Sequence, residues 1–203
     1  FLALLGWNDG TEQEIFTKED LIQRFSIEKV HKGGAHFDFE KAKWFNHEWI
    51  KRFEVSGLRF EVKSLLEHQG ILVSDDLLLD KVIEAVKDRC NLLPDFVQQS
   101  SFFFKPPDTW DIDSVKPKWS DEKKKFFECF IEEAKTIENW ESPFIEDAFK
   151  KLAALQNIKP ADLQLPFRIM LVGGKFGPPV FNIAELLGKE ETASRINNSI
   201  NLF

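Results

Sequence analysis

The stretch FDFEKAKWFNHEWIKRF, residues 37–53, carries aromatic side chains mostly at three- and four-residue steps, the spacing at which residues share one face of an α-helix. These aromatic residues are Phe37, Trp44, Phe45, Trp49 and Phe53. The charged residues on the opposite side are Lys41, Lys43, Glu48 and Lys51. Asp38 is placed to cap the helix. The pattern predicts an amphipathic helix with a buried aromatic face, on which Trp44 is expected to be a core residue rather than a platform for base stacking.

Helical patterns continue on both sides of this stretch. Thr17 and Asp20 form a variant of the capping box before residues 17–24, and Gly70 is placed to end a helix over 54–70. The later expected helices start at Ser74–Asp75, with Leu78, Val82, Ile83 and Val86 on the inner face; at Pro94; at Ser120, with Phe126, Phe127, Phe130, Ile131 and Ala134 inside; over 143–156; and as short helices separated at Gly173-Gly174 and Gly177-Pro178-Pro179. Residues 105–119 hold three prolines and no period, which favours a linker. No segment alternates as a strand does, so the sequence predicts a mainly all-α fold.

The net charge of −7 and the pI near 5.2 argue against tight, non-specific binding to nucleic acid, which requires many neutralised phosphates. Residues 29–63 differ, with eight Lys or Arg against five Asp or Glu and three of the four histidines. On charge alone, a solvated helix face is favoured over an anionic partner as the explanation of this bias. Cys90 and Cys129 form no motif, which favours core thiols in a reducing, cytoplasmic setting.

The sequence begins with FLALLGWNDGTEQEIF, residues 1–16, without an initiator Met, a secretory signal or a span long enough for a membrane. We interpret it as a piece of a longer protein.

Several short stretches partly match known ligand-binding or catalytic motifs, but each lacks the neighbouring residues or structure that the motif requires. GGKFG at 173–177 lacks the Ser or Thr and the strand of a P-loop, and the βααβ setting of a KH domain. Asp75, Asp76 and Asp80 are interpreted as helix-start carboxylates, since acids there complement the helix dipole. His31 and His36 have no partners at metal-ligand spacing, so no metal site is expected. The sequence therefore indicates no catalytic centre.

Three stretches carry a resemblance to a known family. Residues 1–46, from FLALLGW to FDFEKAKWFN, resemble the part of bacterial glutamyl-tRNA synthetases that follows the KMSKS-type signature. KDRCNLLPDFV at 87–97 resembles a later helix–turn element of those proteins, and LPFRIMLVGGKFGPPVFNIAELLGKEETASRI at 165–196 resembles their C-terminal signature. Order and spacing agree along essentially the whole chain.

The resemblance implies a stem-contact segment (1–54) and two helical anticodon-binding domains (55–109 and 110–203). It also implies that the Rossmann-type catalytic domain, a class I ligase domain that uses ATP and Mg²⁺, is not part of this sequence, since its HIGH and KMSKS motifs do not occur. This piece is then expected to hold no cofactor and to be inactive alone, while the parent joins glutamate to its tRNA through glutamyl-adenylate. The implied partner is glutamate tRNA, without DNA or membrane, and a monomer is expected.

The resemblance also assigns roles to residues. The anticodon contacts would be Arg89, Arg168, Gly177, Pro178 and Val180, although the loop residues of GGKFGPP depart from the family pattern. The tRNA backbone contacts would be His31, Lys32, Lys41, Lys43 and Lys175. Relatives that also charge glutamine tRNA often have Gln at the position of Arg89, so this Arg implies discrimination between the two tRNAs. Composition alone favours a different interpretation of Arg89, as a solvent-facing cation at a helix end.

An alternative is a helical protein-interaction module without affinity for tRNA. A free-standing enzyme is disfavoured because no catalytic constellation is found.

Overall fold

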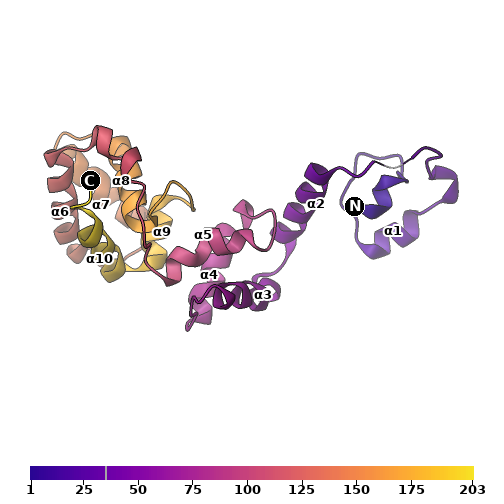
Figure 1. Cartoon of the computed structure of the whole chain (residues 1–203), viewed down its shortest axis with the longest axis horizontal. Helices are drawn as coiled ribbons and strands as arrows, with labels where there is room; N and C mark the ends of the chain where they lie inside the picture. Colours follow the sequence, from indigo (N-terminus) through magenta and orange to yellow (C-terminus); the bar gives the residue numbers. More distant parts are fainter. Residues whose placement is uncertain (35) are drawn as a thin grey trace. The chain divides into compact units, whose positions relative to one another are not determined.

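The computed structural model describes residues 1–34 and 36–203. Helices dominate these residues, and their β pairing consists of one isolated antiparallel bridge between Trp7 and Val30. The mainly all-α fold expected from the sequence is confirmed. The chain divides into two compact units, Phe1–Phe53 (unit 1) and Glu54–Phe203 (unit 2), whose elements are labelled in Figure 1.

The helices begin and end close to the positions that their caps predict. Unit 1 holds η1 (Leu2–Leu5), α1 (Lys18–Arg24), η2 (Ile27–Lys29) and α2 (Phe39–Arg52). Unit 2 holds α3 (Val55–His68), α4 (Asp76–Val86), η3 (Lys87–Arg89), α5 (Asp95–Phe104), η4 (Ile112–Ser114), η5 (Lys116–Lys118), α6 (Asp121–Thr136), α7 (Ser142–Leu155), α8 (Pro160–Val172), α9 (Val180–Leu187) and α10 (Lys189–Ser199). Thr17 and Asp20 form a complete capping box, and the side chains of Asp38, Asp75 and Ser120 each accept amide protons of the helix that follows.

The aromatic face of α2 is less buried than its spacing predicted. Phe45 is buried at 4% exposure, but Trp44 remains 41% exposed and its ring contacts Phe45 edge-on. The exposed aromatic side chains around it are Phe37, Trp49 and Phe53. The expectation that Trp44 is a core residue was therefore wrong. Unit 1 contains a single further α-helix, the seven-residue α1, among the described residues, so few apolar partners are available to cover α2.

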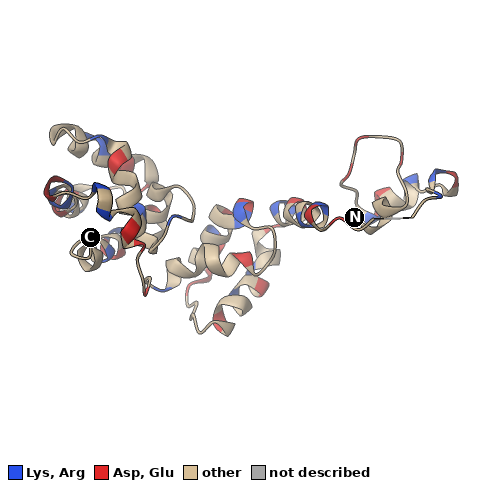
Figure 2. Ribbon diagram, turned by 45° about the horizontal axis from the view of Figure 1, so that its top comes forward, with Lys and Arg blue, Asp and Glu red and all other residues tan. Residues whose placement is uncertain are grey.

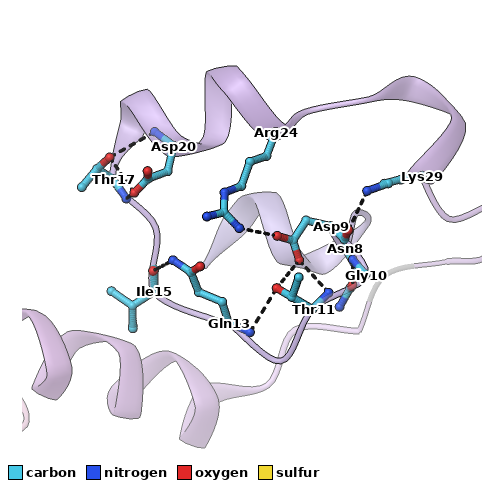
Figure 3. Close-up of polar contacts among 10 residues, drawn as sticks. All are labelled: Asn8, Asp9, Gly10, Thr11, Gln13, Ile15, Thr17, Asp20, Arg24 and Lys29. Atoms are coloured by element: carbon cyan, nitrogen blue, oxygen red, sulfur yellow. Dashed lines mark hydrogen bonds and ion pairs between the residues drawn. The ribbon is translucent and has the colours of Figure 1, made fainter.

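A polar network fixes the loop before α1 (Figure 3). The Asp9 carboxylate accepts the backbone N–H and the hydroxyl of Thr11, at 2.9 and 2.7 Å, and pairs with Arg24 Nη1 at 2.9 Å. Lys29 Nζ donates to the Asp9 carbonyl at 2.6 Å. These bonds from Thr11, and then Arg24, lower the pKa of Asp9 to about 2. Arg24 and Lys29 are therefore both bonded to Asp9 within unit 1.

In unit 2, helices α3, α4 and α5 pack on one another, and α6–α10 form a second group; α9 contacts α4 and α5 as well as α7, α8 and α10. The inner face of α4 is Leu79, Val82, Ile83 and Val86, all at 0% exposure. Leu78, expected on that face, is half-buried and Leu79 replaces it, which completes the i, i+3, i+4, i+7 series of one helix face.

The core of the second group is a cluster of phenylalanine rings. Its members are Phe126, Phe127, Phe130, Phe149, Phe167 and Phe181. Phe149 lies at its centre, with ring centroids of Phe126, Phe130, Phe167 and Phe181 between 4.9 and 5.3 Å away. A tyrosine hydroxyl here would need a buried hydrogen-bond partner. This accounts in part for a chain with 21 Phe and no Tyr.

Residues 105–119 pack against the end of α8 and are not a free linker. Asp111 N–H donates to the Gly173 carbonyl at 2.8 Å, Trp110 Nε1 donates to Met170 O at 3.4 Å, and Val115 is 2% exposed. Gly173 lies so close that a Cβ there would be 2.4 Å from Thr109 O. As the missing period predicted, the segment contains no α-helix, but its tertiary contacts order it and it includes the short 3₁₀ helices η4 and η5.

Candidate nucleic-acid interface

Arg89 projects from a turn that is firmly anchored. It is the last residue of η3, directly after α4, and its side chain is exposed. The next residue, Cys90, is fully buried, and burial raises the pKa of its thiol to about 12, so it is a core thiol. The Asp95 carboxylate accepts the N–H groups of Asn91 and Leu92 at 2.8 and 2.9 Å. Within the described residues no carboxylate pairs with Arg89, so its guanidinium is available to a ligand.

Arg168 lies on α8 and is half-buried. Its Nη1 donates to the carbonyl oxygens of Phe176, Gly177 and Pro178, at 2.9, 3.3 and 2.7 Å. Burial lowers the pKa of Arg168, and the positive charge of Arg89 lowers it further. None of the described residues accepts a hydrogen bond from its Nε or Nη2. One nitrogen therefore holds the loop, and the others keep their donors.

Besides burial, the charge of Arg89 contributes to the lowered pKa of Arg168, so the fold brings these two arginines, far apart in the sequence, within electrostatic range of each other. Two guanidinium groups near each other without a carboxylate create a local positive potential that favours an anion. The planar fork of Arg also matches the paired acceptors of a base edge or a phosphate. We call Arg89 and Arg168 the arginine pair.

The loop 173–180 packs inward. Gly177 has φ +94°, and a Cβ there would lie 3.1 Å from Phe102 Cζ and 3.3 Å from Ile183 Cδ1, so only glycine fits without strain. The side chains of Pro178 and Val180 are buried. These three residues, predicted as anticodon contacts, can offer a ligand little beyond their backbone. The role of the glycine was not evident from the sequence, since the contact with Phe102 is tertiary.

Lys175 stands at the tip of the same loop. It is exposed, and its Nζ lies 3.6 Å from the Asp111 carboxylate. The hydroxyl of Ser114, and then the charge of Lys175, lower the pKa of Asp111. A phosphate ligand of Lys175 would therefore compete with a loose, solvent-exposed ion pair.

The four predicted tRNA-backbone residues of unit 1 fall into two groups. His31 and Lys32 are exposed, and no residue in the described parts of the chain pairs with their side chains; the His31 N–H donates to Gly6 O at 2.8 Å, which fixes the backbone there. Lys41 pairs with Glu14, and Lys43 pairs with Glu40 at 2.8 Å. A phosphate would meet the first two directly and would have to displace carboxylates from the last two.

Residues of both charge signs occur along the helices of both units, as the blue and red ribbon segments of Figure 2 show. Across the described residues, no group of three or more His, Cys, Asp or Glu side chains is placed to hold a metal ion. No helix in the same residues is both long and apolar enough for a bilayer crossing.

Comparison with known proteins identifies the class. Residues 40–200 match the family model described as "Anticodon binding domain". The chain belongs to this family, and the matched residues include the arginine pair.

More particularly, the chain is similar to glutamate–tRNA ligases. It is 36% identical over 200 residues to the glutamate–tRNA ligase of Flavobacterium johnsoniae, covering 98% of this chain and 40% of the relative, and 34% identical over 202 residues to that of Porphyromonas gingivalis, covering 100% and 40%. The crystal structure of a glutamate tRNA ligase from Elizabethkingia meningosepticum, in complex with its amino acid, superposes with a TM-score of 0.90 at 32% identity, covering 98% of this chain and 39% of that one. The chain thus spans about 40% of the length of these relatives and matches their C-terminal part, which confirms the family resemblance seen in the sequence.

Proposed function

We propose that this chain binds glutamate tRNA as the anticodon-reading part of a glutamate–tRNA ligase. In the whole protein, a catalytic domain of the kind found in class I synthetases would join glutamate to the tRNA with ATP and Mg²⁺. The chain covers about 40% of the relatives' length, and we assign that chemistry to the remainder. We further propose a cytoplasmic monomer, with residues 1–54 contacting the stem and 55–109 and 110–203 contacting the anticodon.

The observation that carries the proposal is the arginine pair. Unpaired anticodon bases expose edges that accept two hydrogen bonds from one guanidinium. Arg89 is exposed and without a carboxylate partner in the described chain, and it stands on a turn that Cys90 and Asp95 immobilise. Because the backbone of that turn is already ordered, only the Arg89 side chain loses conformational entropy on binding. We assign to Arg89 the discrimination of glutamate tRNA from glutamine tRNA.

The other predicted residues take more limited roles. Arg168 would present Nε and Nη2 to the anticodon while Nη1 holds the loop. Gly177, Pro178 and Val180 would meet the bases only through their backbone, because their side chains are buried. His31, Lys32, Lys41, Lys43 and Lys175 would meet phosphates, which position the tRNA without specifying its sequence.

A titration of the chain with glutamate tRNA, with glutamine tRNA as competitor, tests the proposal at two salt concentrations. Arg89→Gln is expected to weaken binding of glutamate tRNA by about 1–3 kcal/mol, or roughly 5- to 150-fold, and to reduce the preference for it. Arg89→Lys is the matched variant, because it keeps the charge and loses the fork. If Arg89→Lys binds as the wild type does, Arg89 meets a phosphate and the proposed discrimination is wrong.

The exposed aromatic side chains of α2 favour one other function, that of a protein-interaction module. That module would show no binding to either tRNA at low salt, and no effect of Arg89→Gln on its partner.

A further inference from the structure

Residues 116–125, KPKWSDEKKK, form the most basic short segment outside the positions discussed so far. Five lysines lie there against Asp121 and Glu122, in a chain whose net charge is −7. We call Lys116, Lys118, Lys123, Lys124 and Lys125 the lysine cluster. They lie on η5 and on the first turns of α6.

Carboxylates do not neutralise the lysine cluster. Among the described residues, no Asp or Glu lies within ion-pairing distance of any of its five ammonium groups. Elsewhere on α6 and α7 this is different: Lys135 pairs with Glu132, Lys150 with Glu146 and Lys151 with Asp147, at 2.6–2.7 Å. The positive charge of the cluster is therefore open to an external anion.

Backbone and amide oxygens hold two of these lysines in place. Lys123 Nζ donates to the Lys118 carbonyl at 2.6 Å, and Lys124 Nζ donates to Asn201 Oδ1 at 2.8 Å. Both side chains are half-buried. An ammonium has three protons, so each keeps two donors for a ligand. Because their stems are already ordered, they lose less entropy on binding than free surface lysines do.

The lysine cluster borders the first half of α8, the helix that carries Arg168. Lys118 and Lys123 line a hollow of about 90 Å³ together with Ala161 and Leu165 of α8. Ala161 and Arg168 are seven residues apart, so they share one face of the helix, about 10.5 Å apart along its axis. Ala161, at the hollow, thus lies about two helical turns from Arg168, whereas Asp162 and Pro166 of the hollow lie farther round the helix.

Acidic groups border the same place and limit its charge. Asp162 lines the hollow, and Asp121 and Glu122 occupy the first turn of α6, where they complement the helix dipole. The Ser120 hydroxyl bonds to Glu122 and lowers its pKa. Five lysines still outnumber these three carboxylates.

We propose that the lysine cluster binds the sugar–phosphate backbone of the RNA whose bases meet the arginine pair; this rests on the proposed function. An RNA strand carries a phosphate at every nucleotide, so a strand contacting Arg168 can extend along α8 to the lysine cluster. Lysine is a point charge that suits phosphate and reads no base. An acidic polypeptide would share the charge, but it would have no bases for the arginine pair to bind.

The test is the salt dependence of binding to a glutamate tRNA transcript. The variant is Lys118→Gln/Lys123→Gln. Its matched control is Lys150→Gln/Lys151→Gln, which makes the same change in charge at ion-paired sites on α7. Each lost phosphate contact makes the slope of log K against log [salt] less negative by about 0.7–0.9, so the cluster variant should shift it by about 1.4–1.8. Between 50 and 200 mM salt it should therefore lose roughly 7- to 12-fold less affinity than the wild type does. Thermal unfolding by circular dichroism checks that both variants fold.

The outcomes separate this inference from the proposed function. If the wild type binds tRNA and the cluster variant binds it with the same affinity and the same salt slope as the wild type, the lysine cluster does not contact the RNA. If the wild type does not bind tRNA at all, the proposed function fails and the inference fails with it. If polyglutamate binds the wild type and not the cluster variant, while the tRNA slope is unchanged, the surface recognises acidic protein and the inference is wrong. A shift in slope equal to that of the control would also overturn it.

Discussion

Arg168→Met tests whether one side chain holds the loop 173–180 in shape. The change removes the Nη1 donor to three carbonyl oxygens while the methionine keeps much of the buried volume. Nη1 has two protons, so the bonds at 2.7 and 2.9 Å are the strong ones and the contact at 3.3 Å adds little. Hydrogen bonds from a charged donor contribute about 1.5–3 kcal/mol each. Because Arg168 is half-buried, water replaces part of this hydrogen-bond energy in the variant. We expect the free energy of local opening of the loop to fall by about 2–4 kcal/mol.

Amide hydrogen exchange of the segment 173–181, followed by mass spectrometry, measures this loss locally. A destabilisation of about 2–4 kcal/mol corresponds to exchange roughly 30- to 700-fold faster. Arg52→Met is the control, since Arg52 is half-exposed and its ion pair with Glu48 is 4.0 Å long. That control should change the free energy of unfolding by less than about 0.5 kcal/mol. Exchange within threefold of the wild type in Arg168→Met would refute the assignment of Arg168 as the residue that holds the loop.

Two further predictions follow from the cores of the two units. Phe149→Tyr places a hydroxyl at the centre of the phenylalanine cluster and should lower the free energy of unfolding, measured by urea denaturation, by about 1–3 kcal/mol. The control, Phe144→Tyr, lies at a half-exposed position on the same helix and should leave the free energy of unfolding nearly unchanged. Equal stability of the two variants would contradict the water-free interior of the cluster. The lowered pKa of Asp9 stabilises unit 1 fully above its ordinary value of 3.8, and this contribution is lost as pH falls towards about 2. Acid unfolding of unit 1 should therefore shift in Asp9→Asn, which lacks this pH-dependent contribution, and an identical acid profile would argue against the network in Figure 3.

The sequence predicted those parts of the fold that depend on local rules. Capping residues such as Thr17, Asp38 and Ser120 determine where helices begin, because their side chains bond amides only two or three residues away. The inner face of α6 was also predicted in full, from Phe126 to Ala134, because a long helix repeats its pattern several times. The same reasoning wrongly predicted that Trp44 is buried, because periodicity shows which residues share a helix face but not whether another element covers that face.

The candidate interface divides in the same way. By themselves, the residues of the sequence determined a mainly helical chain with caps, turns and motifs that resemble one family. Tertiary structure alone decided that Arg89 lies close enough to Arg168 to lower its pKa, that Arg168 holds the loop carbonyls, and that Gly177 fits against Phe102. These contacts join residues far apart in the chain. Their geometry depends on how helices pack, which no local pattern encodes.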